Sequence, residues 1–170
     1  MADRLIAWTG HRPELFRDPA AARVRVAQLA RGLVSEQAGT TPRFLVGGQR
    51  GVDTWAALAA LDLGAPFELI LPLEPDAFSA GWAAADKERL HLSLARAARV
   101  QVVGGEPAAA YSERNRLLAT GAHLLVAVWT RTRGGGTAET LAFARAAGTP
   151  IREVLLPPAP GAPRAQGRGV

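Results

Sequence analysis

The sequence alternates short apolar runs with longer segments of helical periodicity, and this alternation limits the folds open to the chain. Most of the runs are continuously apolar, as expected for strands that helices cover on both faces. Strands that alternate with helices are typical of βαβ units, which build a parallel sheet. The predicted strands are Leu5–Thr9, Arg43–Val46, Phe67–Leu71, Val100–Val103, Leu124–Trp129 and Ile151–Leu155.

Five segments between these runs have the spacing of amphipathic or buried helices. Glycines that fit a helix C-cap follow several of them. The predicted helices are Ala20–Gln37, Thr54–Leu63, Trp82–Ala97, Ser112–Ala119 and Ala138–Ala147. We therefore expect an α/β fold, a Rossmann-like doubly wound and mostly parallel sheet with helices on both faces.

The chain of 170 residues has the length of a single domain. After Leu156 the composition changes to proline, glycine, alanine and arginine. Such a segment buries too little apolar surface to offset the entropy lost on ordering. We expect one domain over residues 1–156 and a disordered tail over residues 157–170.

The composition excludes several kinds of site and location. The absence of cysteine excludes disulfides, cysteine-ligated zinc and a thiol nucleophile. No apolar run approaches the roughly 18 residues that span a bilayer, and the first run is too short for a signal peptide. We expect a cytoplasmic protein with no membrane partner, no metal and no cofactor.

The formal net charge is +5, and Lys87 is the only lysine among the 20 basic residues. The arginines are scattered through every predicted helix and loop, with acidic residues among them. This distribution favours solvated surfaces over a stripe that follows a nucleic acid. Anionic small molecules suit the charge, whereas the sequence does not indicate a nucleic-acid partner.

The first strand runs into a polar turn at Thr9, Gly10, His11 and Arg12. Gly10 allows the backbone to approach a ligand, and the Arg12 guanidinium matches the geometry of phosphate. His11 is suited to donating to a phosphate or transferring a proton. The alternative is an ordinary tight turn whose histidine and arginine are exposed.

A second glycine-bearing turn follows the second strand, at Gly47, Gly48 and Gly51. Its backbone N–H groups are placed to face an anion beside a helix N-terminus. The spacing differs from G-x-G-x-x-G, so the pattern alone is weak. Asp53 fits a helix N-cap, and the alternative is a contact with a ribose hydroxyl.

The third turn carries three consecutive glycines, Gly134, Gly135 and Gly136, before Thr137 opens a helix. This arrangement predicts a phosphate cradle, to which the neighbouring arginines add charge. The alternative is a flexible surface loop. In a doubly wound sheet all three turns follow strand carboxyl ends, where ligands bind.

One further group consists of Tyr111, Arg114 and Asn115, which share a helix face by their spacing. Tyr111 is suited to stacking on a base or ribose, and Arg114 and Asn115 are suited to hydrogen bonding. A solvated helix face is an equal alternative.

Taken together, these motifs resemble the SLOG superfamily, which groups the DprA/Smf and LOG (lonely guy) proteins. The pattern is Thr9-Gly10-His11-Arg12-Pro13, Gly47-Gly48…Gly51-Val52-Asp53-Thr54, Tyr111…Arg114-Asn115 and Gly134-Gly135-Gly136-Thr137. It is most similar to the YspA/YpsA-like branch and spans about residues 5–155. The resemblance implies a Rossmann-like fold that binds nucleotides or nucleotide-derived ligands.

LOG members cleave the N-glycosidic bond of cytokinin nucleotide monophosphates, and their motif reads P-G-G-x-G-T-x-x-E. In this sequence Glu139 follows Thr137 by two residues rather than three. One residue of an α-helix corresponds to about 100° of rotation, which makes Glu139 a weak candidate for the catalytic carboxylate. Asp53 and Glu113 are the other candidates.

Three functions compete at this point. The favoured one is binding of an AMP-, ADP-ribose- or NAD-like ligand, as a sensor or binding protein. The second is a LOG-like nucleoside-monophosphate phosphoribohydrolase. Single-stranded DNA binding of the DprA type is least favoured, because the chain has one tyrosine and no basic stripe. SLOG relatives often form dimers, so the resemblance implies a homodimer or larger homo-oligomer.

Overall fold

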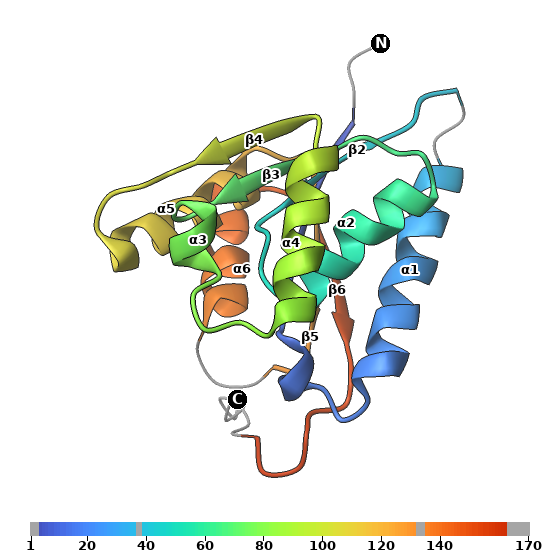
Figure 1. Ribbon diagram of the computed structural model, residues 1–170. Coiled ribbons are helices and arrows are strands. Elements are labelled where there is room, and N and C mark those ends of the chain that lie inside the picture. The colour runs from blue at the N-terminus through green and yellow to red at the C-terminus, as the bar shows by residue number, and fades with distance from the viewer. Residues whose placement is uncertain (1–3, 37–38, 132–134, 163–170) are drawn as a thin grey trace.

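The computed structural model describes residues 4–36, 39–131 and 135–162, and these form one six-stranded sheet with helices on both sides (Figure 1). All neighbouring strands are parallel, and their spatial order is β4-β3-β2-β1-β5-β6. The strands are β1 (Leu5–Gly10), β2 (Arg43–Val46), β3 (Phe67–Leu71), β4 (Arg99–Val102), β5 (Leu124–Trp129) and β6 (Ile151–Leu155). The predicted α/β class and parallel sheet are confirmed.

Two layers of helices cover the sheet. The helices are η1 (Pro13–Leu15), α1 (Pro19–Ser35), α2 (Val52–Asp62), α3 (Pro75–Phe78), α4 (Ala84–Arg96), α5 (Pro107–Thr120) and α6 (Gly136–Ala147). Helices α1, α2 and α4 lie on one face, and α5 and α6 lie on the other (Figure 1). The two faces therefore have separate apolar cores.

The continuous apolarity of the strands follows from these two cores. In β5, Leu124, Val126 and Val128 point into the core beneath α1 and α2. Leu125 and Ala127, which alternate with them, point into the core beneath α5 and α6. Successive strand residues face opposite sides of a sheet, so a strand covered on both sides is apolar throughout.

The strand order creates a switch point between β1 and β5. The chain leaves β1 for α1 on one face and leaves β5 for α6 on the other. In open α/β sheets a crevice forms at such a point, outside the carboxyl ends of the strands. The turns after β1 and β5 therefore leave neighbouring strands at the same edge of the sheet, and we refer to the space outside this edge as the crevice.

Helix α5 departs most from its predicted bounds, and the short helices η1 and α3 were not predicted. Helix α5 begins at Pro107, several residues before the predicted start, because Glu106 caps it by accepting from the N–H groups of Ala108 and Ala109. The short helix α3 was not predicted, since a single turn has no detectable periodicity.

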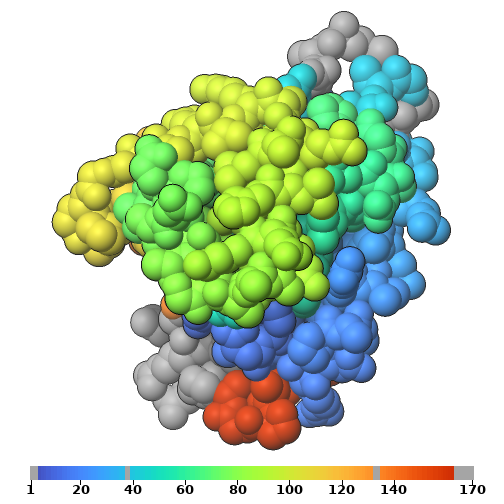
Figure 2. All heavy atoms as spheres, in the orientation of Figure 1, coloured from blue at the N-terminus to red at the C-terminus, as the bar shows by residue number. Residues whose placement is uncertain are grey.

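The chain beyond β6 continues against the domain. The Arg17 N–H donates to the Pro157 carbonyl at 3.0 Å, and the Ala159 N–H donates to the Leu15 carbonyl at 2.9 Å. In Figure 2 the red C-terminal segment correspondingly lies against the blue N-terminal segment. The contacts with the domain thus extend beyond residue 156, and the rest of the predicted tail, residues 163–170, lies outside the described residues.

No helix in the described part of the chain is both long and apolar enough to cross a membrane. Within the same ranges, no group of three or more histidine, aspartate or glutamate side chains is arranged to hold a metal ion.

Candidate functional site

The first two glycine-bearing turns are packed directly against each other. The backbone N–H of Val52, at the start of α2, donates to the His11 carbonyl at 3.3 Å. The His11 N–H in turn donates to the Val128 carbonyl of β5 at 3.3 Å. A Cβ on Gly51 would overlap the His11 carbonyl, and a Cβ on Gly10 would overlap the Val128 carbonyl. Glycine at these positions therefore permits the close approach of the three segments.

The second turn is also fixed from α5. Arg114 donates from Nη1 to the Gly47 carbonyl at 2.6 Å, and a Cβ on Gly47 would overlap this guanidinium. On the other side of the loop, a Cβ on Gly48 would overlap the Leu71 side chain at the end of β3. The loop is thus held between α5 and the carboxyl end of β3.

A chain of polar contacts runs from α2 through α5 to α6. Arg114 Nη1 lies 3.9 Å from Asp53 Oδ2, and Arg114 Nε donates to Asn115 Oδ1 at 2.9 Å. Asn115 Nδ2 then donates to Glu139 Oε2 at 2.7 Å, and Ser112 Oγ donates to Glu139 Oε1 at 2.7 Å. Sequence reasoning missed Ser112, although its spacing of three from Asn115 places both on one helix face.

Burial controls the ionisation of the first pair in this network. Asp53 is buried, and burial raises the pKa of its carboxyl to about 6, although the Arg114 charge acts in the opposite direction. Burial likewise lowers the pKa of Arg114, which the charge of Asp53 partly restores. The pair therefore supplies little net positive charge to the crevice.

The N-cap role predicted for Asp53 is wrong. The N-cap of α2 is Gly51, at φ 89° and ψ −129°, and Asp53 lies in the first turn of the helix. Its carboxylate accepts from the Gln49 N–H at 3.3 Å, so it organises the preceding loop instead. A contact between Asp53 and a ribose hydroxyl stays a prediction.

His11 is buried at the centre of the site. Its ring lies 5.8 Å from that of Trp129 and 6.0 Å from that of Phe16, measured between centroids. Burial, assisted by the charge of Arg12, lowers the pKa of His11 to about 4. The imidazole is therefore neutral at pH 7, and it offers hydrogen bonding rather than positive charge to a ligand.

Among the described residues, Arg12 and Arg50 bring arginine charge to the turns after β1 and β2. Arg12 is half exposed, with Nε 3.6 Å from Glu14 Oε1. Arg50, whose role the sequence did not indicate, donates to the same carboxylate at 3.1 Å and lies over the Trp82 ring at 5.8 Å. Arg12 is therefore the more available of the two, because its contact with Glu14 is long and solvated.

The third turn starts α6 without a side-chain cap from any described residue. Its N-cap is Gly135, at φ 89°, and Gly136 approaches the Asn115 side chain, which a Cβ there would meet at 3.4 Å. Thr137 is buried in the first turn. Gly134 lies outside the described residues, as does the arginine that precedes it.

Side-chain capping varies among the helices, and α4, for example, begins after Ala83 without a side-chain cap. Asp18 caps α1 and Glu106 caps α5 through side-chain hydrogen bonds. By contrast, α2 and α6 begin at glycines and receive no such bond from the described side chains. In α2 the Val52 N–H donates to the His11 carbonyl and the Thr54 N–H donates to the Gln49 carbonyl. The start of α6 is therefore the better placed of the two to receive another acceptor.

Tyr111 lies beside the network rather than in it. Its ring centroid is 5.7 Å from the Arg114 guanidinium carbon and 6.1 Å from the centroid of Phe78. The side chain is partly exposed, whereas Arg114 and Asn115 are buried. The structure thus separates the three residues, since only Tyr111 has a surface open to solvent.

Comparisons with known proteins bear on the fold. No protein-family model matches the chain, and no curated protein matches its sequence. DNA processing protein A (DprA) from Streptococcus pneumoniae superposes with a TM-score of 0.63 and 18% identity, over 89% of this chain and 50% of that one. DprA from Helicobacter pylori is described by its single-stranded DNA binding mode. It superposes with a TM-score of 0.67 and 16% identity, over 95% of this chain and 68% of that one. The chain therefore shares the fold of these two DprA structures.

A third match, the structural genomics target TM1055, gives a TM-score of 0.59 and 20% identity over 87% of this chain and 72% of that one. These low identities establish the shared fold alone. The chain also spans only half the length of the S. pneumoniae DprA. The fold that the motif resemblance implied is thus confirmed, and the ligand is a separate question.

Three carboxylates of the domain were candidates for catalysis, and they lie in different surroundings. Glu113 is exposed and pairs with Arg116 at 2.6 Å, outside the polar network. Asp53 is buried against Arg114. Glu139 reaches the crevice side of α5 despite its shifted position in the motif, but both of its oxygens accept hydrogen bonds.

Proposed function

We propose that the chain binds a nucleotide or nucleotide-derived ligand, with its phosphate at the N-terminal turn of α6. The observation that carries this proposal is the uncapped start of α6 at Gly135, beside the switch point between β1 and β5. Backbone N–H groups and the helix dipole together favour an anion at such a position.

Other parts of the crevice suit the rest of such a ligand. The Arg12 side chain is half exposed, so its guanidinium is available to a phosphate. His11 is neutral at pH 7, so the positive charge at the site comes from arginine rather than from this imidazole. Tyr111 presents a partly exposed ring for a base or ribose. AMP-, ADP-ribose- and NAD-like molecules share these chemical features.

The arrangement of the carboxylates favours a site that binds the ligand over one that cleaves it. A general base needs an oxygen within hydrogen-bond reach of the substrate. Glu139 already accepts from Ser112 and Asn115, and these two hydrogen bonds occupy both of its oxygens. Release of free base from AMP, abolished by Glu139→Gln, would instead support the phosphoribohydrolase.

A matched pair of variants tests the phosphate site. Gly136→Asp places a carboxylate on the first turn of α6, where it stabilises the helix but repels a phosphate. Gly136→Ala adds the same Cβ without the charge. We expect thermal stabilisation of the wild type and Gly136→Ala by AMP, ADP-ribose, NAD or a cyclic nucleotide, and none for Gly136→Asp.

The size of the expected effect follows from linkage. A ligand at a hundred times its Kd stabilises the native state by about 2.7 kcal/mol. If no nucleotide in the panel shifts the melting temperature, the proposal fails. An equal shift for wild type and Gly136→Asp would place the phosphate elsewhere.

Single-stranded DNA is a second candidate, because the H. pylori DprA that shares this fold is described as binding it. This comparison is at odds with the expectation, from the scattered arginines, that the chain has no nucleic-acid partner. Fluorescence anisotropy with a labelled oligonucleotide at two salt concentrations separates the candidates. For a single strand the slope of log K against log salt is about −0.7 per phosphate contacted, whereas a mononucleotide site releases few counterions.

A further inference from the structure

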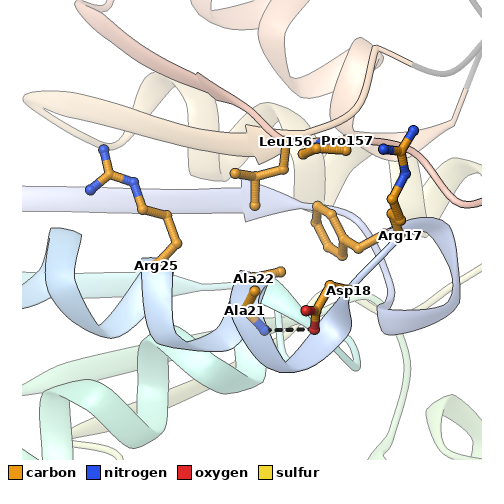
Figure 3. Close-up of a pocket in the computed structure, with 8 residues that line it drawn as sticks. Arg17, Asp18, Ala21, Ala22, Arg25, Leu156 and Pro157 are labelled. Atoms are coloured by element: carbon orange, nitrogen blue, oxygen red, sulfur yellow. Dashed lines mark hydrogen bonds between the residues drawn. The ribbon is translucent and has the colours of Figure 1, made fainter.

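A pocket lies away from the start of α6, between the first turn of α1 and the segment that follows β6 (Figure 3). Its volume is about 190 Å³. The apolar side chains that line it are Phe16, Ala21, Ala22, Leu156 and Pro157. Drug-sized sites typically measure about 300–1,000 Å³, so this pocket fits a smaller molecule.

Backbone hydrogen bonds hold the two walls of the pocket together. The Arg17 N–H donates to the Pro157 carbonyl at 3.0 Å, and Phe16 forms an isolated antiparallel bridge with Pro158. Phe16 also packs into the core against Trp55, at 6.0 Å between ring centroids. The pocket is therefore preformed, and a ligand would not have to order it.

Two cationic side chains stand at opposite ends of this pocket. Figure 3 shows Arg17 and Arg25 on either side of Leu156. Both are exposed, and neither forms an ion pair with another described residue. The one carboxylate at the rim, that of Asp18, already accepts from the Ala21 N–H at 2.9 Å as the cap of α1.

We propose that this pocket binds a small carboxylic acid with a compact apolar body. The apolar lining gains from covering a hydrocarbon chain or ring. A guanidinium pairs with a carboxylate through charge-assisted hydrogen bonds, and Arg17 and Arg25 are available for such a pair. The assignment concerns a different site from the nucleotide crevice and does not depend on the proposed function.

The test uses octanoate as the acid and octanamide as its uncharged counterpart. Titrations of the full chain, followed by isothermal calorimetry and by backbone amide NMR, measure affinity and location. We expect octanoate to shift the amide signals of residues 16–25 and 156–157. Octanamide is expected to bind at least about tenfold more weakly, because it lacks the charge-assisted hydrogen bond.

Variants locate the site. Ala21→Trp fills the pocket from an exposed position of α1 that tolerates a large side chain, and it should abolish binding. Ala20→Trp is the matched control, because Ala20 is exposed on the same helix but does not line the pocket. The double variant Arg17→Gln/Arg25→Gln should weaken octanoate at least about tenfold while leaving octanamide unchanged.

Several results would overturn the proposal. Absence of octanoate binding at millimolar concentration removes it, as does equal affinity for octanamide. Binding that survives Ala21→Trp shows that the acid binds elsewhere. A dimer in light scattering that Ala21→Trp dissociates would show that a second copy of the chain, not a small acid, occupies the pocket.

Discussion

Asn115 on α5 donates its side-chain amide to Glu139 on α6 at 2.7 Å, while its carbonyl oxygen accepts from Arg114 Nε at 2.9 Å. The two bonds fix the orientation of the amide, because a guanidinium only donates and an ionised carboxylate only accepts. One side chain thus connects the buried cation to the carboxylate at the crevice. The link joins the two helices that cover one face of the sheet.

Removing this link should destabilise the protein without exposing a new charge. Asn115→Ala leaves Arg114 Nε without its buried acceptor and Glu139 with one donor fewer. We expect a loss of about 1–3 kcal/mol in the free energy of unfolding, measured by urea denaturation. Arg116→Ala, on the exposed face of α5, is the control and should change stability by less than about 1 kcal/mol. Equal effects would show that the link contributes no stability.

The Arg114–Asp53 pair should behave as a buried ion pair. Arg114→Met leaves Asp53 buried without its cation and should cost about 3–5 kcal/mol. Adding Asp53→Asn removes the uncompensated charge, so the double variant should recover part of that loss. A double-mutant cycle in urea gives the coupling energy between the two residues. Strict additivity would contradict the pairing.

The raised pKa of Asp53 has a defined consequence for stability. Its folded value is about 6 against an ordinary 3.8, so between these values the native state holds a proton that the unfolded state releases. Stability from this group is therefore complete below about pH 4 and is lost as pH rises through 6. We expect the unfolding free energy of the wild type, relative to Asp53→Asn, to fall over this range. A flat difference would indicate an ordinary pKa.

His11 should titrate in the opposite sense. Its folded pKa is about 4 against an ordinary 6.5, so the unfolded state binds the proton first as pH falls. The stability it contributes is present above about 6.5 and is lost on acidification towards 4. The ring carbon signals of His11, assigned by their absence from His11→Gln, should not move between pH 7 and pH 5. A midpoint near 6.5 would show that the ring is solvated.

Gly51 and Gly39 offer a matched comparison of two glycines with positive φ. Their φ values are 89° and 88°, but a Cβ on Gly39 meets no atom within 4 Å, whereas one on Gly51 overlaps the His11 carbonyl. Substitution by alanine strains both backbones by roughly 1–2 kcal/mol. The overlap should cost Gly51→Ala about 1–3 kcal/mol more, measured by urea denaturation. If the two variants lose the same free energy of unfolding, the turn that contains His11 shifts without cost to make room for the added Cβ.

The strands and helices were readable from sequence because the signals are local. Each of β2, β3, β5 and β6 begins and ends where the apolar run predicts. Gly148 ends α6 in the left-handed conformation that favours glycine, as its position after the helical segment predicts. The order of strands and glycine-bearing turns along the chain also indicated an edge of the sheet suited to a ligand.

Only the tertiary structure decided what the polar residues near that edge do. Asp53 has the spacing of an N-cap, yet it is buried against Arg114, a residue 61 positions further along the chain (114 minus 53). Glu139 has the wrong spacing for the LOG motif, yet it lies within 2.7 Å of Ser112 and Asn115. The pocket beside Phe16 needs residues from both ends of the domain. Periodicity reports the faces of single elements, whereas such contacts depend on how distant elements pack, which no local pattern records.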